Sequence, residues 1–211
     1  KDKMGLKAYQ QAVATKKRQT LLEAAERLFL AQGYERASVA AIADEAGVSL
    51  ATLYKHYRTK GDLFAAVIED LARDLADRLG ADLGETVPPE IALREYLLGY
   101  AQALAHTHFV ELIRLLVAEA SAFPELAEAF YDRAKKPLFA PLVVYLEAQR
   151  SRGFLTIEKP ELALRQLLGM VEASLIWRRF LLRDPGITET HVREVAEEAT
   201  ATFLARYRAA G

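Results

Sequence analysis

Apolar residues recur at three- and four-residue intervals along most of the chain, which is the spacing of one face of a helix. The first such run begins at Thr20, and Gly33 ends it. Ser38 and Ser49 each precede a short run, where a serine hydroxyl can cap the free backbone amides at a helix start, and Gly47 ends the first of these two runs. The pattern therefore predicts one helix followed by two short helices that a tight turn separates.

The helical spacing continues to the end of the chain. A further helix is expected to begin at Lys60 or Gly61, and Pro137 and Pro141 predict a new start or a kink inside a later run. Two long helices are expected over roughly residues 160–182 and 188–207, with the turn signal RDPG between them. Strand-like alternation of useful length is not found, so the predicted class is all-α, with about nine helices.

Composition adds a charge asymmetry to this picture. The chain of 211 residues is 52% hydrophobic and has a net charge of -1, but residues 1–60 hold 11 basic against 6 acidic side chains. A basic segment indicates an anionic partner such as nucleic acid, although a solvated basic face would look the same. The sequence has no cysteine, no secretory signal pattern and no apolar run long enough to cross a membrane. These features predict a soluble cytoplasmic protein without a membrane partner.

The stretch GVSLATLYKHYRTK, residues 47–60, has the residue types of a DNA-reading helix. In a helix-turn-helix unit the second helix enters the major groove with its N-terminal end, which requires small or polar exposed residues there. Tyrosines and a histidine at helical spacing can also be ordinary packing residues, and we assign Leu53 and Tyr57 to the core. The predicted contacts to bases and phosphates are Ser38, Ser49, Leu50, Ala51, Thr52, Tyr54, Lys55, His56 and Lys60.

The sequence from residue 21 to 70, LLEAAERLFLAQGYERASVAAIADEAGVSLATLYKHYRTKGDLFAAVIED, resembles the DNA-binding domain of the TetR family of bacterial transcriptional regulators. The resemblance implies a homodimeric regulator, usually a repressor, whose C-terminal helices bind a small molecule and thereby release a palindromic operator. It also implies a DNA-binding domain over residues 1–60 and a ligand-binding and dimerisation domain over residues 61–211, in which AEASAFPELAEAFYDRA looks similar to AcrR and AefR-like members. The pair Leu50-Ala51 departs from the family, which often has a polar residue followed by glycine at these positions.

Symmetric readout of two half-sites requires a dimer that holds two reading helices about 34 Å apart. The last two helices carry apolar stripes that could form a four-helix interface between subunits, or could instead face their own core. The residues of these two stripes are Leu164, Leu168, Val171 and Leu175, and Val192, Val195, Ala199, Phe203 and Tyr207.

A second set of apolar and aromatic positions is the candidate lining of a ligand cavity, for which we expect an apolar or aromatic effector. Arg114 and His108 are the candidate polar anchors in this set, and the same residues could equally be plain core. The predicted lining comprises Leu97, Tyr100, Leu104, Phe109, Ile113, Arg114, Val117, Tyr145, Met170, Ser174 and Trp177.

Two other classes of protein compete with this interpretation. A helical-bundle enzyme or metalloprotein could use His106, His108 and Glu111, but the repeated Glu-x-x-His pairs of a di-iron bundle are missing from the sequence. Phosphate-binding loops and nucleophile motifs are also missing, so no catalytic residue, metal or cofactor is expected. The other alternative is a DNA-binding regulator without a small-molecule effector.

Overall fold

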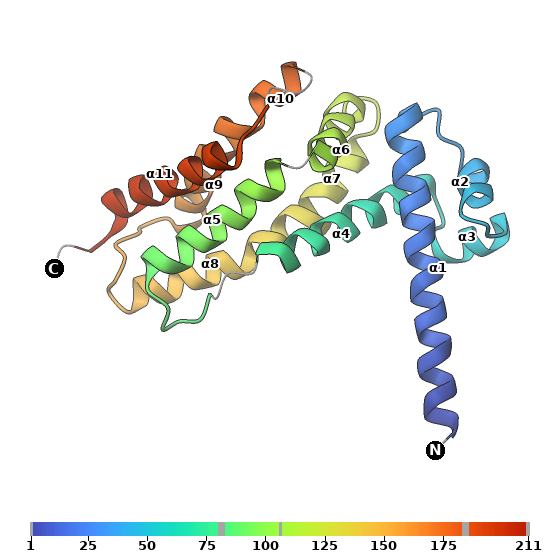
Figure 1. Cartoon of the computed structure of the whole chain (residues 1–211), viewed down its shortest axis with the longest axis horizontal. Helices are drawn as coiled ribbons and strands as arrows, with labels where there is room; N and C mark the ends of the chain where they lie inside the picture. The colour runs from blue at the N-terminus through green and yellow to red at the C-terminus, as the bar shows by residue number, and fades with distance from the viewer. Residues whose placement is uncertain (1, 80–82, 106, 183–185, 210–211) are drawn as a thin grey trace. The chain divides into compact units, whose positions relative to one another are not determined.

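The structure is a computed structural model that describes residues 2–79, 83–105, 107–182 and 186–209 (Figure 1). All the regular elements of the described residues are helices. The β-type pairing among these residues is limited to one isolated bridge between Leu155 and Arg208, which confirms the all-α prediction. The elements are α1 (Asp2–Gln32), α2 (Val39–Glu45), α3 (Leu50–His56), α4 (Lys60–Leu79), α5 (Pro89–Ala105), α6 (Thr107–Glu119), α7 (Pro124–Phe130), the π-helical turn η1 (Tyr131–Lys135), α8 (Lys136–Ser151), α9 (Pro160–Leu175), α10 (Trp177–Leu181) and α11 (Glu189–Tyr207).

The chain divides into two compact units. Unit 1 consists of residues 1–70 and 115–133, and unit 2 consists of residues 71–114 and 134–211. The unit that holds the two short helices thus runs past residue 60, where the sequence placed the domain boundary, and it takes in a second segment from the middle of the chain. Both boundaries near residues 70 and 114 fall inside helices, α4 and α6.

The core of unit 1 is built around four aromatic rings. Phe29, Tyr34 and Phe64 pack with ring centroids 5.4 to 5.6 Å apart, and Phe123 packs edge-on against Tyr34 at 4.8 Å. Aromatic pairs at these separations add to the stability that burial alone provides. Phe123 belongs to the second segment of the unit, so this cluster joins residues 115–133 to the first 70 residues of the chain.

The core of unit 2 lies around α5, whose neighbours include α9 and α11 (Figure 1). Gly99 marks the closest approach in this core, because a Cβ atom at this position would come 2.9 Å from the carbonyl oxygen of Leu79. Any larger side chain at position 99 would therefore push α5 away from the end of α4.

Two of the predicted long runs are divided in the structure. The run that contains Pro137 becomes α7, η1 and α8, which follow one another with helical backbone angles, and Pro137 and Pro141 both lie within α8. The run predicted over residues 160–182 is broken at Ile176, between α9 and α10. These breaks explain why the structure has more helical elements than the sequence predicted.

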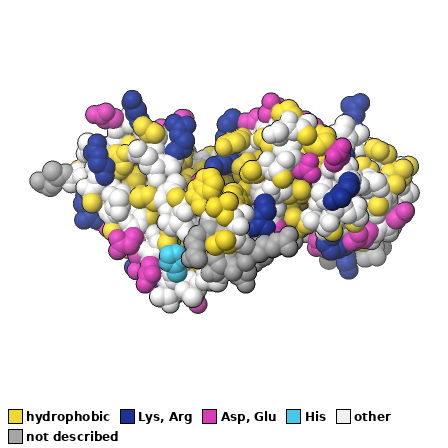
Figure 2. All heavy atoms as spheres, turned by 90° about the horizontal axis from the view of Figure 1, so that it is seen from above, with side chains coloured by type: hydrophobic (Ala, Val, Ile, Leu, Met, Phe, Trp, Pro, Cys, Tyr) yellow, Lys and Arg dark blue, Asp and Glu magenta, His cyan; other side chains and the backbone are white. Residues whose placement is uncertain are grey.

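The exposed surface carries charges of both signs. Figure 2 shows basic and acidic side chains interspersed on one face, with hydrophobic side chains between them. Among the described residues, no helix has the length and the apolar character that a bilayer span requires.

Candidate nucleic-acid interface

The turn between α2 and α3 has the geometry that sets two short helices at a fixed angle. Gly47 adopts a φ of +66°, which is a left-handed conformation that residues with a side chain rarely adopt. The N–H of Val48 donates to the carbonyl of Ala43 at 3.0 Å, and the N–H of Gly47 donates to the carbonyl of Asp44 at 3.1 Å. This pair of bonds is a Schellman motif, so α2 ends at a defined residue and α3 begins three residues after Gly47.

Ser49 caps the N-terminus of α3. Its Oγ accepts the backbone N–H of Thr52 at 3.1 Å and lies 2.7 Å from Thr52 Oγ1. Both residues are exposed. The backbone of Ser49 is extended and not helical, as an N-cap residue requires. The hydroxyl groups of Ser49 and Thr52 therefore lie next to each other at the N-terminal end of α3. In helix-turn-helix proteins this end of the second helix enters the major groove.

One side of α3 is buried and the other is exposed. Leu53 is fully buried, whereas Leu50 is 41% and Tyr54 is 46% exposed. Ala51, Thr52, Lys55 and His56 are exposed as well. Leu53 thus anchors α3 to the rest of unit 1. The exposed positions form one surface that carries hydroxyl, imidazole, ammonium and apolar groups. We call this surface, from Ser49 to His56 without Leu53, the α3 face.

Ser38 caps α2 in the same way, because its Oγ accepts the backbone N–H of Ala41 at 3.1 Å. The side chain is exposed. A capped helix start presents further backbone N–H groups to solvent, and these can bind a phosphate oxygen.

Lys60 has a different environment from the other predicted contacts. Its Nζ donates to the carbonyl oxygens of Tyr34 at 2.8 Å, Glu35 at 2.9 Å and Ala37 at 3.3 Å. An ammonium group has three N–H donors, so these three carbonyls use its full capacity. In this conformation Lys60 fixes the loop between α1 and α2 and has no donor left for a phosphate.

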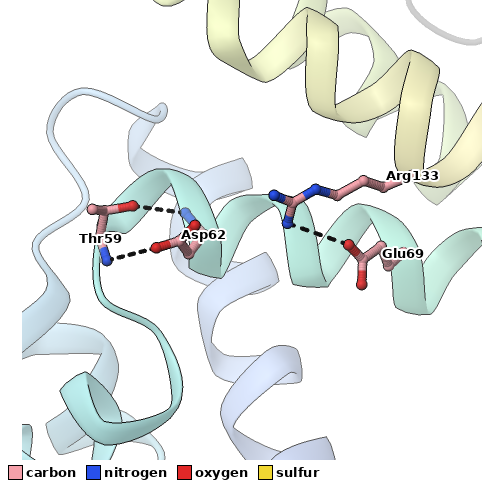
Figure 3. A network of polar contacts seen from close by, with 4 residues as sticks. All are labelled: Thr59, Asp62, Glu69 and Arg133. Carbon is pink, nitrogen blue, oxygen red and sulfur yellow. Dashed lines mark hydrogen bonds and ion pairs between the residues drawn. The ribbon is translucent and has the colours of Figure 1, made fainter.

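Sequence reasoning missed the cap of α4. The N–H of Thr59 donates to Asp62 Oδ2 at 3.1 Å, and the N–H of Asp62 donates to Thr59 Oγ1 at 3.0 Å (Figure 3). This reciprocal arrangement is a capping box with aspartate as its acidic member. The tetrapeptide TKGD, a threonine followed three residues later by an acid, was the signal that could have identified it.

A second missed feature is the attachment of residues 115–133 to the rest of unit 1. Glu119 Oε1 accepts the backbone N–H of Tyr34 at 3.1 Å, and Arg133 pairs with Glu69 of α4 at 3.4 Å (Figure 3). Neither bond could be read from the sequence, because the partners are 85 and 64 residues apart.

The two stripes predicted for the dimer interface lie mostly in the core of unit 2. Leu164, Leu168, Val171, Leu175, Val192, Ala199 and Phe203 are buried there, and Val195 and Tyr207 are partly buried against the same core. Because these side chains already pack within their own chain, the structure favours the alternative that the stripes face their own core. The faces of α9 and α11 that remain exposed lie on the opposite side of each helix.

The residues predicted to line a ligand cavity lie partly in the core of unit 2 and partly on exposed surface. The buried members pack in the core of unit 2, where the Tyr100 hydroxyl donates to Glu172 Oε1 at 2.7 Å, and burial raises the pKa of Tyr100 well above its usual value. Leu97, Leu104 and Tyr145 are buried, whereas Phe109, Ile113, Arg114 and Met170 are partly buried. Trp177 is 63% exposed, Ser174 is exposed, and Val117 is 61% exposed and belongs to unit 1.

The candidate polar anchors and the metal alternative are described only in part. Arg114 donates to the carbonyl oxygen of Arg179. His106 lies outside the described residues, and so does the side chain of His108. Within the described part of the chain, no three histidine, aspartate or glutamate side chains gather as a metal site would require.

A Schellman turn, a capped and exposed second helix and a buried anchor define the chain as a helix-turn-helix protein. A family model described as bacterial regulatory proteins, tetR family, matches residues 21–67, and a model of the AefR-like transcriptional repressor, C-terminal domain, matches residues 91–209. The chain belongs to the TetR family of transcriptional regulators, and its C-terminal part is of the AefR-like type.

Individual relatives agree with this assignment. The HTH-type transcriptional repressor SCO4008 of Streptomyces coelicolor is 32% identical over 152 residues, which is 71% of this chain and 72% of its own length. A solved TetR-family regulator of Mesorhizobium loti has a TM-score of 0.80 and 25% identity, covering 92% of this chain and 98% of its own. The flavonoid-responsive regulator FrrA has a TM-score of 0.77 and 30% identity over the same shares of the two chains. This protein is therefore a transcriptional regulator and not an enzyme.

Proposed function

We propose that this regulator is a homodimeric repressor that binds a palindromic operator through the α3 face and that a small apolar or aromatic molecule releases it from DNA. The observation that carries the proposal is the α3 face itself, in which Ser49 and Thr52 hydroxyls stand at the exposed helix start while Leu53 is buried. Repression is supported by the AefR-like repressor model and by the repressor SCO4008.

Within this proposal the residues of the α3 face have different roles. Ser49, Leu50, Ala51 and Thr52 reach base edges, because they occupy the first turn of the helix. Leu50 offers an apolar surface that suits the methyl group of thymine. Tyr54, Lys55 and His56, with the cap Ser38, contact phosphates. Lys60 acts by holding the loop between α1 and α2 in place.

The operator proposal is tested by selecting bound fragments from a genomic DNA library and measuring their affinity as a function of salt. Sequence-selective, salt-dependent binding of a palindrome by the wild-type protein supports it. The Thr52→Ala variant should lose selectivity at particular base pairs, and Ser151→Ala, which removes an exposed hydroxyl group of unit 2, is the matched control. If the wild-type protein selects no fragment above bulk DNA, the repressor proposal fails.

For the dimer we propose the exposed faces of α9 and α11 in place of the buried stripes. Leu162, Ala173 and Trp177 are exposed on or directly after α9, and Gly169 faces open space, since a Cβ there would meet no atom within 4 Å. Small residues on such a face allow two helices to approach closely. A hollow of about 620 Å³ between Met170 and Phe203 on this side would receive side chains of the second subunit.

Sedimentation velocity tests this interface. Ala173→Arg should convert a dimer into a monomer at micromolar concentration, because an arginine cannot fit between closely packed helices. Ala140→Arg, at an exposed position of α8, should leave the dimer intact. A wild-type monomer, or an Ala173→Arg dimer as tight as the wild type, would contradict the proposal.

The proposed effector is supported by the name of FrrA, which describes a flavonoid-responsive protein. A panel of aromatic and fatty-acyl compounds, titrated against the preformed operator complex, tests for release. The placement of Trp177 and Ser174 outside the core favours a second candidate, a regulator that no small molecule releases. Unchanged operator affinity with every compound would support that candidate.

A further inference from the structure

A pocket of about 450 Å³ lies at one end of unit 2, and none of the residues predicted to line the effector cavity is part of its lining. Its walls are the loop of residues 86–88, the first two residues of α5, the C-terminal end of α8 with Gly153 to Leu155, and the C-terminal end of α11 (Figure 1). This volume is within the range of small-molecule sites.

Hydrogen bonds hold these walls in place. The N–H of Thr156 donates to the carbonyl of Tyr207 at 2.7 Å, and the N–H of Ala209 donates to the carbonyl of Phe154 at 3.1 Å. On the opposite wall the Tyr145 hydroxyl donates to the carbonyl of Val87 at 2.7 Å. The backbone of these walls is therefore preformed, and a ligand would lose little free energy in ordering it.

Gln149 gives the pocket one buried polar group without a partner. The residue lines the pocket, is 1% exposed, and its Nε2 donates to the carbonyl of Glu85 at 2.8 Å. That bond fixes which end of the amide is the oxygen, and Oε1 is buried with no hydrogen-bond partner among the described residues. A buried acceptor of this kind is normally satisfied by a donor, so a shift of the Gln149 side chain that opens Oε1 to the pocket would be stabilised by a hydroxyl or an amide hydrogen of a ligand.

The rim of the pocket carries an excess of positive charge. Arg208 pairs with Glu90, and both residues line the pocket. Arg152 also lines it and stacks over the Phe154 ring, 5.0 Å from the centroid, and no carboxylate of the described residues is paired with it. Gln149 and Arg152 are three residues apart in sequence at the end of α8, so their side chains can lie on the same side of the helix end.

We propose that this pocket binds a small phenolic carboxylic acid. The phenol hydroxyl donates to Gln149 Oε1, and the carboxylate forms a charge-assisted bond with the guanidinium of Arg152. The aromatic ring packs against Phe154, Leu155 and Leu204, which supply the apolar part of the lining. The site does not depend on the proposed action on DNA, because none of its residues belongs to unit 1.

The test is isothermal titration of the full chain, without DNA, with 4-hydroxybenzoate, benzoate and phenol. The wild-type protein should bind 4-hydroxybenzoate about tenfold more tightly than either analogue, because each analogue lacks one of the two polar contacts. Arg152→Ala should abolish the preference for 4-hydroxybenzoate over phenol, and Arg150→Ala, an exposed arginine two residues earlier that does not line the pocket, should leave this preference unchanged.

Gln149→Leu should abolish the preference over benzoate. This variant also loses the bond to the Glu85 carbonyl, so its thermal unfolding is measured first. The comparison of the three ligands on the wild-type protein does not depend on this variant. Equal affinity for the three compounds, no binding at millimolar concentration, or an unchanged preference in Arg152→Ala would overturn the proposal and leave water as the partner of Gln149.

Discussion

The ammonium group of Lys60 lies 2.8 Å from the carbonyl oxygen of Tyr34 and 4.5 Å from the centre of the Tyr34 ring. One side chain at the start of α4 thus holds both the backbone and the ring of the residue that follows Gly33. The Tyr34 ring in turn packs against Phe29, Phe64 and Phe123. This contact makes Lys60 part of the framework that carries the helix-turn-helix.

Replacing Lys60 by methionine is therefore expected to destabilise the protein in the absence of DNA. Loss of the charged donor leaves three carbonyl groups without it, and the expected decrease in the free energy of unfolding is about 1–3 kcal/mol. Chemical denaturation of Lys60→Met and of Lys55→Met, the exposed control, measures this difference. A Lys60→Met protein as stable as wild type, with weaker DNA binding only, would return Lys60 to the role of a phosphate contact.

Lys55 is expected to behave in the opposite way. It is exposed on the α3 face, so Lys55→Ala should leave thermal stability unchanged. If it contacts one phosphate, the slope of log K against log salt concentration should become shallower by about 0.9, with affinity reduced to a similar degree for all sequences. Filter binding or fluorescence anisotropy between 50 and 200 mM salt measures the slope, and an unchanged slope would remove Lys55 from the interface.

The fold class and the position of α3, the second helix of the helix-turn-helix, could be predicted from local signals. Gly33, Ser38, Gly47 and Ser49 are residues whose roles depend on neighbours within five positions, and the structure has each of them at a helix end. The amphipathic period also separated Leu53 from the exposed side of α3, because a helix face is a property of sequence spacing alone.

The contacts of particular side chains could not be predicted in the same way. The place of Lys60 among the cations and donors of residues 54–60 predicts a phosphate contact, but its three carbonyl partners depend on the path of a loop 23 to 26 residues earlier. Similarly, an apolar stripe such as Leu164 to Leu175 indicates that a helix is buried on one side, without indicating whether its own chain or a second subunit covers it. Only the three-dimensional packing distinguishes these cases.

The capping box of α4 provides a test of local stability. Thr59→Ala and Asp62→Ala should each decrease the free energy of unfolding by about 1 kcal/mol, since each removes one bond to a free backbone amide. The two losses should not add fully in the double variant, because the groups form one reciprocal unit. Urea denaturation of the three proteins gives the coupling, and strict additivity would show that the two bonds act independently.

Buried tyrosines should make unit 2 sensitive to alkaline pH. Burial raises the pKa of Tyr145 from 10.0 to about 12, even though the nearby Arg152 lowers it slightly. A group with a raised pKa holds its proton in the folded state after the unfolded chain has lost it, so stability should fall as pH rises from about 10 to about 12 and should be unaffected below pH 9. Tyr145→Phe should show a smaller fall in this window than wild type, measured by urea unfolding at pH 9, 10 and 11. Equal pH slopes would contradict the assignment.

Glu119 offers the sharpest test of how residues 115–133 are held in unit 1. Its Oε1 accepts the N–H of Tyr34, and Tyr34 is buried. Glu119→Gln keeps a side-chain oxygen at this position and should change the free energy of unfolding by less than about 1 kcal/mol, whereas Glu119→Leu leaves the amide without an acceptor and should cost about 1–3 kcal/mol. Hydrogen exchange of the Tyr34 amide reports on the same bond directly: exchange should accelerate in Glu119→Leu and remain slow in Glu119→Gln. Equal exchange rates in the two variants would mean that another group protects this amide, and that the aromatic contact between Tyr34 and Phe123 alone attaches the segment at this point.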